Sequence, residues 1–203
     1  MGTYLNPQRF KYKAKVLPKR IPPSIPLYYS DYEHQSDMDH LETIPASAWA
    51  IRNGLLDNEN TVGGGHYIRV RGLQIDNVFI RFRCMVRHDG GCYIYLNRPG
   101  TVVTNADGDG YGFGIAVGGD IGQVFRSDDG TTTTLSSVGI VLENNILYPI
   151  ELLYRDGYML CRVLRNGTWY ECEATDLTYT PPFEVGTWCQ YDAAFDWIEV
   201  HRA

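Results

Sequence analysis

The chain has 203 residues, of which 44% are hydrophobic and 21% are charged, and its formal net charge is -6. These values are ordinary for a soluble globular protein, and no apolar run approaches the roughly 20 residues that a membrane-spanning helix needs. The acidic balance also disfavours binding to nucleic acid, because phosphates repel a negatively charged surface. We therefore expect partners other than membranes and nucleic acids.

The first 30 residues form a basic, proline-rich segment. Prolines at this density favour an extended, polyproline-like arm over a helix. Because the whole chain carries -6 and this segment carries +6, the remainder carries -12. The arm either docks on an acidic surface or remains a solvated tail. Its six cations are Arg9, Lys11, Lys13, Lys15, Lys19 and Arg20.

An acidic, polar stretch at residues 31–45 follows the arm and predicts a linker. We therefore expect an arm and linker over residues 1–45 and one folded domain over residues 46–203. The basic N-terminus is not followed by the apolar stretch of a signal peptide. This pattern predicts synthesis in the cytoplasm.

From residue 47 onward the sequence alternates between short strands and turns rich in Gly and Asp. In residues 76–87, Ile80 and Phe82 point to one face while Arg81 and Arg83 point to the other. No segment has a helical apolar period over three turns. The pattern predicts an all-β fold, an antiparallel two-sheet jelly-roll sandwich with an extended N-terminal arm. The predicted strands are 47–52, 66–71, 76–87, 92–98, 111–118, 121–126, 136–142, 147–155, 158–165, 168–174, 187–192 and 195–202.

Outward-pointing arginines and tyrosines suggest a binding face on this sandwich. The candidate residues are Arg69, Arg71, Arg81, Arg83, Tyr93 and Tyr95, which neighbouring strands would gather into one patch. Arginine forks and tyrosine rings suit glycans that bear carboxylates or sulfates, or an acidic protein surface. Alternatively, these arginines pair with the acids of the domain and solvate the sheet.

A calcium loop is a further candidate. Its ligands would be Asn105, Asp107 and Asp109, followed by a glycine that allows a sharp turn. An EF-hand is excluded because Ala116 stands where the twelfth-position Glu is required. In a β domain a distant acid, such as Asp120 or Asp128, could complete the site. The alternative is a turn built on Asx side chains, which needs no ion.

The five cysteines show no CxxC motif and no spacing typical of a zinc site. Asn166-Gly167 predicts a two-residue type I′ turn, and counting outward from it places Cys161 opposite Cys172. Opposed β-carbons are roughly 4.5–5.5 Å apart, so a disulfide could form between these two residues. The alternative is that the cysteines are reduced and act as small buried hydrophobic residues.

Several segments resemble the concanavalin A-like lectin/glucanase superfamily in its laminin-G-like branch. They are "SAWAIRNGLLDN", "DNVFIRFRCMVR", "GCYIYLNR", "GYGFGIAVGG", "YPIELLYRDGYMLCRVLRNGTWYECE", with Tyr148 where a Trp is common, and "FEVGTWCQYDAAFDWIEVHR". The resemblance spans residues 47–202 and implies the jelly-roll fold, whose lectins often bind calcium. It also implies that Asp196, near the start of the closing strand, has a structural role.

Hydrolases of this superfamily carry an E-x-D-x-E run on one strand, which brings two carboxylates close together. No predicted strand contains such a run. Glu171 and Glu173 have the spacing of one such pair, but they lie on an ordinary hairpin arm. Alternation places Asp196 on the face of Ile198 and Glu199 on the opposite face. The sequence therefore predicts a protein that is not an enzyme.

The leading hypothesis combines these features as a structural or decoration protein of a tailed-phage virion. Such a protein would display the lectin-like sandwich and dock on protein subunits through its basic arm. Its expected location is the virion or an extracellular surface. The alternative is a carbohydrate-binding module for acidic or neutral glycans, with calcium as a candidate cofactor, and a glycoside hydrolase is a third hypothesis.

Overall fold

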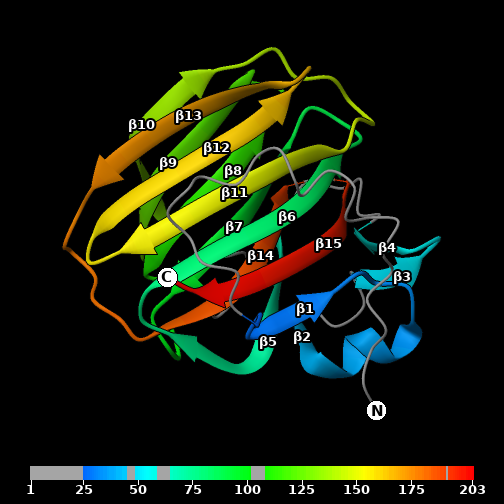
Figure 1. The fold of residues 1–203 in the computed structure, drawn as a ribbon, viewed down its shortest axis with the longest axis horizontal. Helices are drawn as coiled ribbons and strands as arrows, with labels where there is room; N and C mark the ends of the chain where they lie inside the picture. Colours follow the sequence, from blue (N-terminus) through cyan, green and yellow to red (C-terminus); the bar gives the residue numbers. More distant parts are fainter. Residues whose placement is uncertain (1–24, 45–48, 59–64, 102–107, 191) are drawn as a thin grey trace.

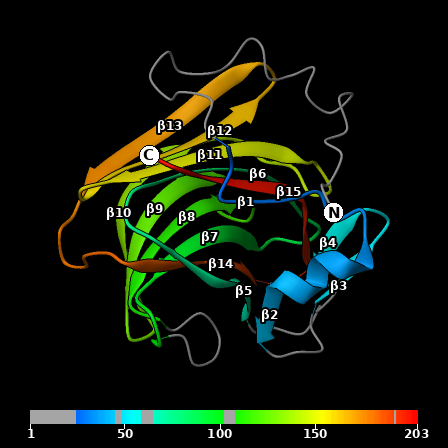
Figure 2. The same cartoon turned by 60° about the horizontal axis from the view of Figure 1, so that its bottom comes forward.

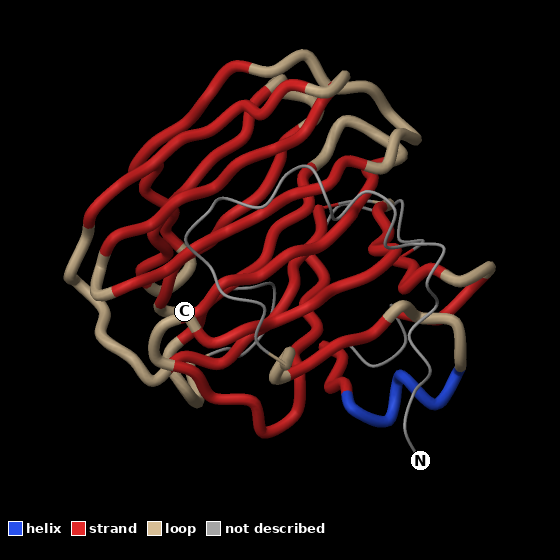
Figure 3. Tube along the Cα trace, viewed as in Figure 1, coloured by secondary structure: helices blue, strands red, loops and turns tan. Residues whose placement is uncertain are grey.

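A computed structural model describes residues 25–44, 49–58, 65–101, 108–190 and 192–203. They fold into two antiparallel sheets that pack face to face as a sandwich (Figure 1). Strands connected by short turns account for most of the trace, and a short 3-10 helix, η2 (Gln35–His40), lies near the N-terminal side (Figure 3). The predicted all-β jelly-roll sandwich is therefore confirmed.

The two layers lie one above the other in Figure 2. We call the eight-stranded layer the back sheet, although its strands lie nearer to the viewer in Figure 1; their order is β13-β12-β11-β6-β15-β4-β3, with β1 paired to β15. Its strands are β1 (Tyr28–Ser30), β3 (Trp49–Arg52), β4 (Leu55–Asn58), β6 (Val78–Val86), β11 (Tyr148–Arg155), β12 (Tyr158–Arg165), β13 (Thr168–Thr175) and β15 (Ala193–Arg202). The front sheet has seven strands in the order β10-β9-β8-β7-β14-β5-β2. They are β2 (Leu41–Ile44), β5 (Gly65–Ile75), β7 (Gly91–Asn97), β8 (Gly110–Ala116), β9 (Ile121–Asp128), β10 (Thr131–Gly139) and β14 (Phe183–Gln190).

Alternating side chains of both sheets fill the space between them. Ile80 and Phe82 of β6 are fully buried, as the alternation of that strand predicts. Tyr154 of the back sheet stacks on Tyr111 of the front sheet at 5.8 Å between ring centroids. Phe183 of the front sheet packs edge-on against Tyr154 at 5.1 Å. These aromatic contacts join the two layers at the end where the candidate site lies.

Residues predicted as arm and linker contribute to both sheets. β1 pairs with β15 through Ser30↔Ile198, and β2 pairs with β5 through Leu41↔Val70. Leu41 is almost fully buried, so this stretch is part of the domain and the linker prediction is wrong here. Strands of three or four residues at a sheet edge are too short to show alternation, so the sequence pattern does not predict them.

Among the described residues, no helix has the length and apolar character to cross a membrane.

The β12–β13 hairpin has the predicted turn and register. Asn166 and Gly167 both have positive φ, at 50° and 78°, as a type I′ turn requires. Cys161 and Cys172 are Cα partners across the two strands, as predicted. Both are buried free thiols, as are the other three cysteines, so the structure has no bridge between them.

The closing strand β15 departs from simple alternation at Asp196. A β-bulge between Phe195 and Trp197 makes Asp196 an extra residue relative to β6. Its carboxylate accepts a hydrogen bond from Arg83 Nε at 2.7 Å on the outer face of the back sheet. The prediction that Asp196 shares the face of the core residues is therefore wrong. Asp196 still does not form a pair with Glu199, which binds a different arginine.

A row of alternating charge crosses the outer face of the back sheet. Its members are consecutive Cα partners in five neighbouring strands: Glu199, Arg81, Glu151, Arg162 and Glu171. Arg81 donates to Glu199 at 3.2 Å and to Glu151 at 3.1 Å, and Arg162 Nε donates to Glu151 at 2.7 Å. The side chain of Glu151 is only 8% exposed. We call this row the charge ladder; it fixes the register of the strands that carry it.

The central acid of the charge ladder should contribute strongly to stability. We expect Glu151→Ala to lower the free energy of unfolding by about 3 kcal/mol, because it leaves two buried guanidinium groups without a shared partner. Glu143→Ala is the control, because it removes an exposed pair with Arg165 and should cost about 1 kcal/mol or less. Urea unfolding of both variants measures the difference. Equal losses would contradict a special role for the ladder.

Candidate functional site

The structure divides the predicted Arg/Tyr patch between two faces. Arg69, Arg71, Tyr93 and Tyr95 belong to β5 and β7 of the front sheet, whereas Arg81 and Arg83 belong to β6 of the back sheet. The prediction of a single patch is therefore wrong. The chain crosses from one sheet to the other between β5 and β6, and the sequence does not show this change.

An aromatic cluster covers the outer face of the front sheet. It consists of Tyr67, Tyr93, Tyr95, Phe125 and Trp188, and we call it the aromatic floor. Tyr93 stacks on Trp188 at 5.5 Å, and the Tyr95 and Phe125 rings meet edge-on at 5.3 Å. This cluster is separate from the core between the sheets. The front sheet is therefore packed with aromatic side chains on both faces.

Glycines on neighbouring strands make room for these rings. A Cβ added at Gly112 would lie 2.1 Å from Phe125, and one added at Gly186 would lie 2.1 Å from the Tyr67 hydroxyl. Both distances are far below van der Waals contact, so neither position accepts a side chain without displacing a ring. These rings thus pack directly against the glycine backbone, and Trp188 is the partly exposed member of the floor.

A row of polar side chains crosses the same outer face. Glu184, Asn97, Gly110 and Ser127 are consecutive Cα partners on β14, β7, β8 and β9. Gly110 separates Asn97 from Ser127, whose Cα atoms stand roughly 10 Å apart at the usual strand spacing. A Cβ added at Gly110 would lie 3.0 Å from Asn97 Oδ1, so Asn97 packs closely over this glycine. Asn97 Nδ2 donates to the Tyr67 hydroxyl at 3.1 Å. We call these four residues the polar row.

Two atoms of the polar row are buried without a partner. Asn97 and Ser127 are 0% and 1% exposed, and neither Asn97 Oδ1 nor Ser127 Oγ has a hydrogen-bond partner. Buried polar atoms are nearly always hydrogen-bonded, because an unpaired one costs free energy. The Trp188 indole N–H on the same face is likewise buried and unpaired. These unsatisfied polar atoms lie just beneath the surface of the outer face and mark it as a candidate site for a molecule with hydroxyl groups.

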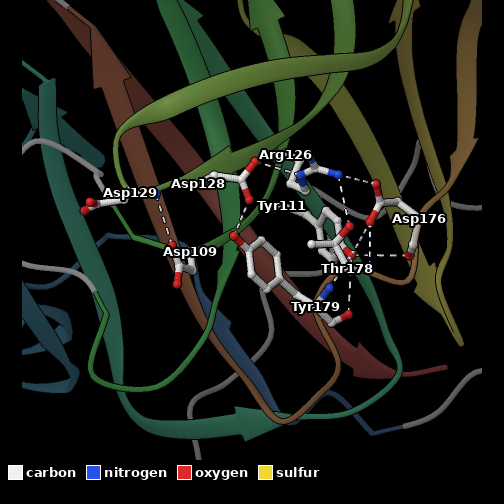
Figure 4. A network of polar contacts seen from close by, with 8 residues as sticks. All are labelled: Asp109, Tyr111, Arg126, Asp128, Asp129, Asp176, Thr178 and Tyr179. Carbon is white, nitrogen blue, oxygen red and sulfur yellow. Dashed lines mark hydrogen bonds and ion pairs between the residues drawn. The ribbon is translucent and has the colours of Figure 1, made fainter.

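Carboxylates gather at the end of the front sheet, next to the polar row (Figure 4). Asp109 directly precedes Gly110, and Asp128 directly follows Ser127. Asp109 Oδ1 accepts a hydrogen bond from the backbone N–H of Asp129 at 3.0 Å. We call Asp109, Asp128 and Asp129 the acidic rim.

Tyr179 and Arg126 hold the acidic rim in place. The Tyr179 hydroxyl donates to Asp128 Oδ1, and the Arg98 guanidinium lies 5.8 Å from the Tyr179 ring centre. Arg126 donates to Asp128 at 2.8 Å and to Asp176 at 2.9 Å (Figure 4). Asp176 follows β13 of the back sheet, so Arg126 connects the ends of the two layers.

Hydrogen bonding keeps two of these carboxylates ionised. Hydrogen bonds from Tyr179 and Arg126 lower the pKa of Asp128. Burial alone would raise the pKa of Asp176, but hydrogen bonds from Thr178, Tyr111 and Arg126 outweigh burial and lower it. Ionised carboxylates of this kind accept hydrogen bonds well.

The predicted acid pair Glu171 and Glu173 lies elsewhere. Both side chains are exposed on β13 of the back sheet, away from the polar row, and Glu173 accepts a hydrogen bond from Tyr158 at 2.6 Å. This position fits the interpretation of an ordinary hairpin arm.

The calcium prediction falls mainly on residues that are not described. Asn105 and Asp107 lie outside the described residues, as do the arm cations between Arg9 and Arg20. Among the described residues, no group of three or more acidic, His or Cys side chains could hold a metal ion. Asp109 binds Arg98 and a backbone N–H, so it does not fit a calcium site by itself.

No protein-family model matches the chain. A search of curated proteins likewise gives no match. Solved structures, in contrast, share its fold. The carbohydrate-binding module CBM66 from Bacillus subtilis superposes with a TM-score of 0.62 at 12% identity, covering 77% of this chain and 91% of the module.

Two further structures show the same fold. The exoplasmic/lumenal domain of VIP36, in a form bound to Ca²⁺ and Man3GlcNAc, has a TM-score of 0.67 at 10% identity, covering 82% of this chain and 84% of that domain. A protein of unknown function with a galectin-like fold from Bacillus subtilis has a TM-score of 0.67 at 12% identity, covering 88% and 96%. The fold is thus a jelly-roll sandwich shared with these carbohydrate-binding and galectin-like domains, in agreement with the fold that the resemblance of the sequence implies.

Sequence patterns missed most of the site. Asn97, Ser127 and Glu184 are single polar residues in apolar strands, and only the register of four strands aligns them. The one available signal was the glycine at alternate positions of β8, which marks close approach of other side chains. The sequence predicts Asp109 as a calcium ligand, whereas in the structure it belongs to the acidic rim.

The acidic rim should make stability depend on pH. Because the folded pKa of Asp128 lies below its unfolded value of about 3.9, its contribution is present above that pH and is lost as the pH falls through the folded value. We expect the loss in unfolding free energy between about pH 6 and about pH 3 to be smaller in Asp128→Asn than in the native chain. Urea unfolding at the two pH values measures it. Asp129→Asn, at an exposed position, is the control, and the same loss in all three proteins would contradict the prediction.

Proposed function

We propose that this chain is a carbohydrate-binding module that binds a glycan on the outer face of its front sheet. The observation that carries the proposal is the pair of buried, unpaired atoms Asn97 Oδ1 and Ser127 Oγ, which flank Gly110. A sugar hydroxyl can donate to one group and accept from another, so it satisfies both kinds of atom.

The surroundings of the polar row also suit a sugar. Trp188 presents a partly exposed ring and an unpaired indole N–H, which match the apolar and polar sides of a pyranose or furanose. Glu184, at the end of the polar row, supplies carboxylate oxygens with room for further hydrogen bonds, because an ionised carboxylate has about four acceptor sites. The CBM66 and VIP36 structures, which are a carbohydrate-binding module and a domain bound to Man3GlcNAc, support the proposal through their shared fold.

The role as a decoration protein of a tailed-phage virion stays a prediction, together with the virion or extracellular location and the protein partners. Its support is the charge asymmetry between the basic first 30 residues and the acidic remainder. We expect deletion of residues 1–24 to release the chain from a larger assembly, as light scattering would show. Equal monomer masses for both forms would contradict the docking role.

Ser127→Ala should separate glycan binding from stability. The hydroxyl has no partner in the protein, so its loss should leave the free energy of unfolding unchanged or slightly higher. Loss of one hydrogen bond to the ligand should weaken glycan binding by about tenfold. Titration calorimetry with a glycan selected on an array gives the affinity, and urea unfolding gives the stability.

Ser137→Ala is the matched control, because Ser137 is an exposed serine on the neighbouring strand β10. It should change neither binding nor stability. If Ser127→Ala binds the glycan as well as the native chain does, the polar row is not the contact surface.

A further inference from the structure

The arginines around the polar row are already neutralised. Arg69 donates to Glu42 at 2.9 Å and to Glu184 at 2.7 Å, which places a compensated cation beside Asn97. At the other end of the row, Arg98 lies 3.5 Å from Asp109. An arginine whose fork is occupied by carboxylates has few donors left for an acidic ligand.

Arg126 completes this pattern. Its guanidinium bridges Asp128 and Asp176, and hydrogen bonds to these two acids raise its pKa against the opposing effect of burial. Asp129 adds an exposed carboxylate next to the bridge. Three arginines on or next to the front sheet thus pair with five carboxylates, Glu42, Glu184, Asp109, Asp128 and Asp176. Asp129 is a sixth acid near them, so negative charge exceeds positive charge at this end of the sheet.

The arginines of the predicted patch that lie on the back sheet cannot bind an acidic ligand at the polar row. Arg81 and Arg83 are paired with acids on the opposite face of the sandwich. Arg71 is exposed on the front sheet and donates to the Leu41 carbonyl at its edge, beside β2. The arginines that suggested an acidic ligand in the sequence are therefore either engaged or peripheral to the polar row.

From this arrangement we infer that the site selects neutral glycans and disfavours those that carry uronic acid or sulfate groups. The inference rests on the proposed carbohydrate-binding function and names the class of its ligand. Neutral hydroxyls donate to the carboxylate of Glu184 in the polar row, whereas a ligand carboxylate cannot donate and is repelled by Glu184 and, at longer range, by the acidic rim at the end of the sheet. The ligand class follows from the balance of charge, and not from the presence of arginine in the sequence.

The size of the effect follows from Coulomb's law in a solvated site. At about 7 Å in water, one uncompensated charge should weaken binding of each ligand carboxylate about threefold. This penalty should shrink as the ionic strength rises, because salt screens exposed charges over roughly 10 Å at 0.1 M. A ligand that loses affinity for steric reasons would show no such dependence on salt.

The test uses the full chain and an array of neutral oligosaccharides, each paired with its counterpart oxidised at C6 to the uronic acid. For each neutral oligosaccharide that binds, the affinities of it and of its acidic counterpart are then measured at about 20 mM and about 500 mM salt. We expect neutral members to bind, acidic counterparts to bind about threefold more weakly per charge at low salt, and the two to converge at high salt.

Asp129→Asn and Glu171→Gln form a matched pair of variants, since each removes one exposed carboxylate, from the rim and from the back sheet respectively. The ratio of neutral to acidic affinity should fall in Asp129→Asn and stay constant in Glu171→Gln. Equal or tighter binding of the acidic members would overturn the inference and leave the proposed function standing. Absence of binding to every oligosaccharide on the array would overturn the proposed function, and the inference with it.

Discussion

The charge ladder is the constraint on which the arrangement of the back sheet depends. Its side chains sit on Cα partners in five neighbouring strands, so a slip of one residue in any strand would place like charges or unpaired charges side by side. The same register turns Ile80, Phe82 and their equivalents toward the front sheet. The ladder thus orders a face that never meets the candidate ligand, and the core that results supports the face that does.

The front sheet relies on a different device. Its outer face is built by rings lying on glycine backbone, and this packing leaves only a narrow strip of polar side chains. Arg126 joins that strip to the back sheet through Asp128 and Asp176. The candidate site therefore combines a rigid apolar base with a polar edge that ion pairs between side chains hold in place. Such an arrangement limits the reorganisation that ligand binding requires.

Local patterns revealed the fold better than the site. Asn166-Gly167 fixed both a turn and the opposition of Cys161 and Cys172, because a two-residue turn leaves one register. The bulge at Asp196 and the short strands β1, β2 and β4 have no such signal. The polar row depends on contacts between strands that lie up to 87 residues apart, from Asn97 to Glu184, and no periodicity within one strand can show them. The assignment of strands to two sheets was equally hidden, which is why the Arg/Tyr patch was predicted as one surface.

The rings that lie on glycines link positions that are distant in the chain. Gly112 can gain a side chain only if Phe125 becomes smaller, and the same holds for Gly186 and Tyr67. In the evolutionary history of this domain, the two positions of each pair are bound to change together or not at all. Covariation between a glycine and an aromatic residue would therefore indicate the same packing on the outer face of the front sheet, even in sequences too divergent to align by identity.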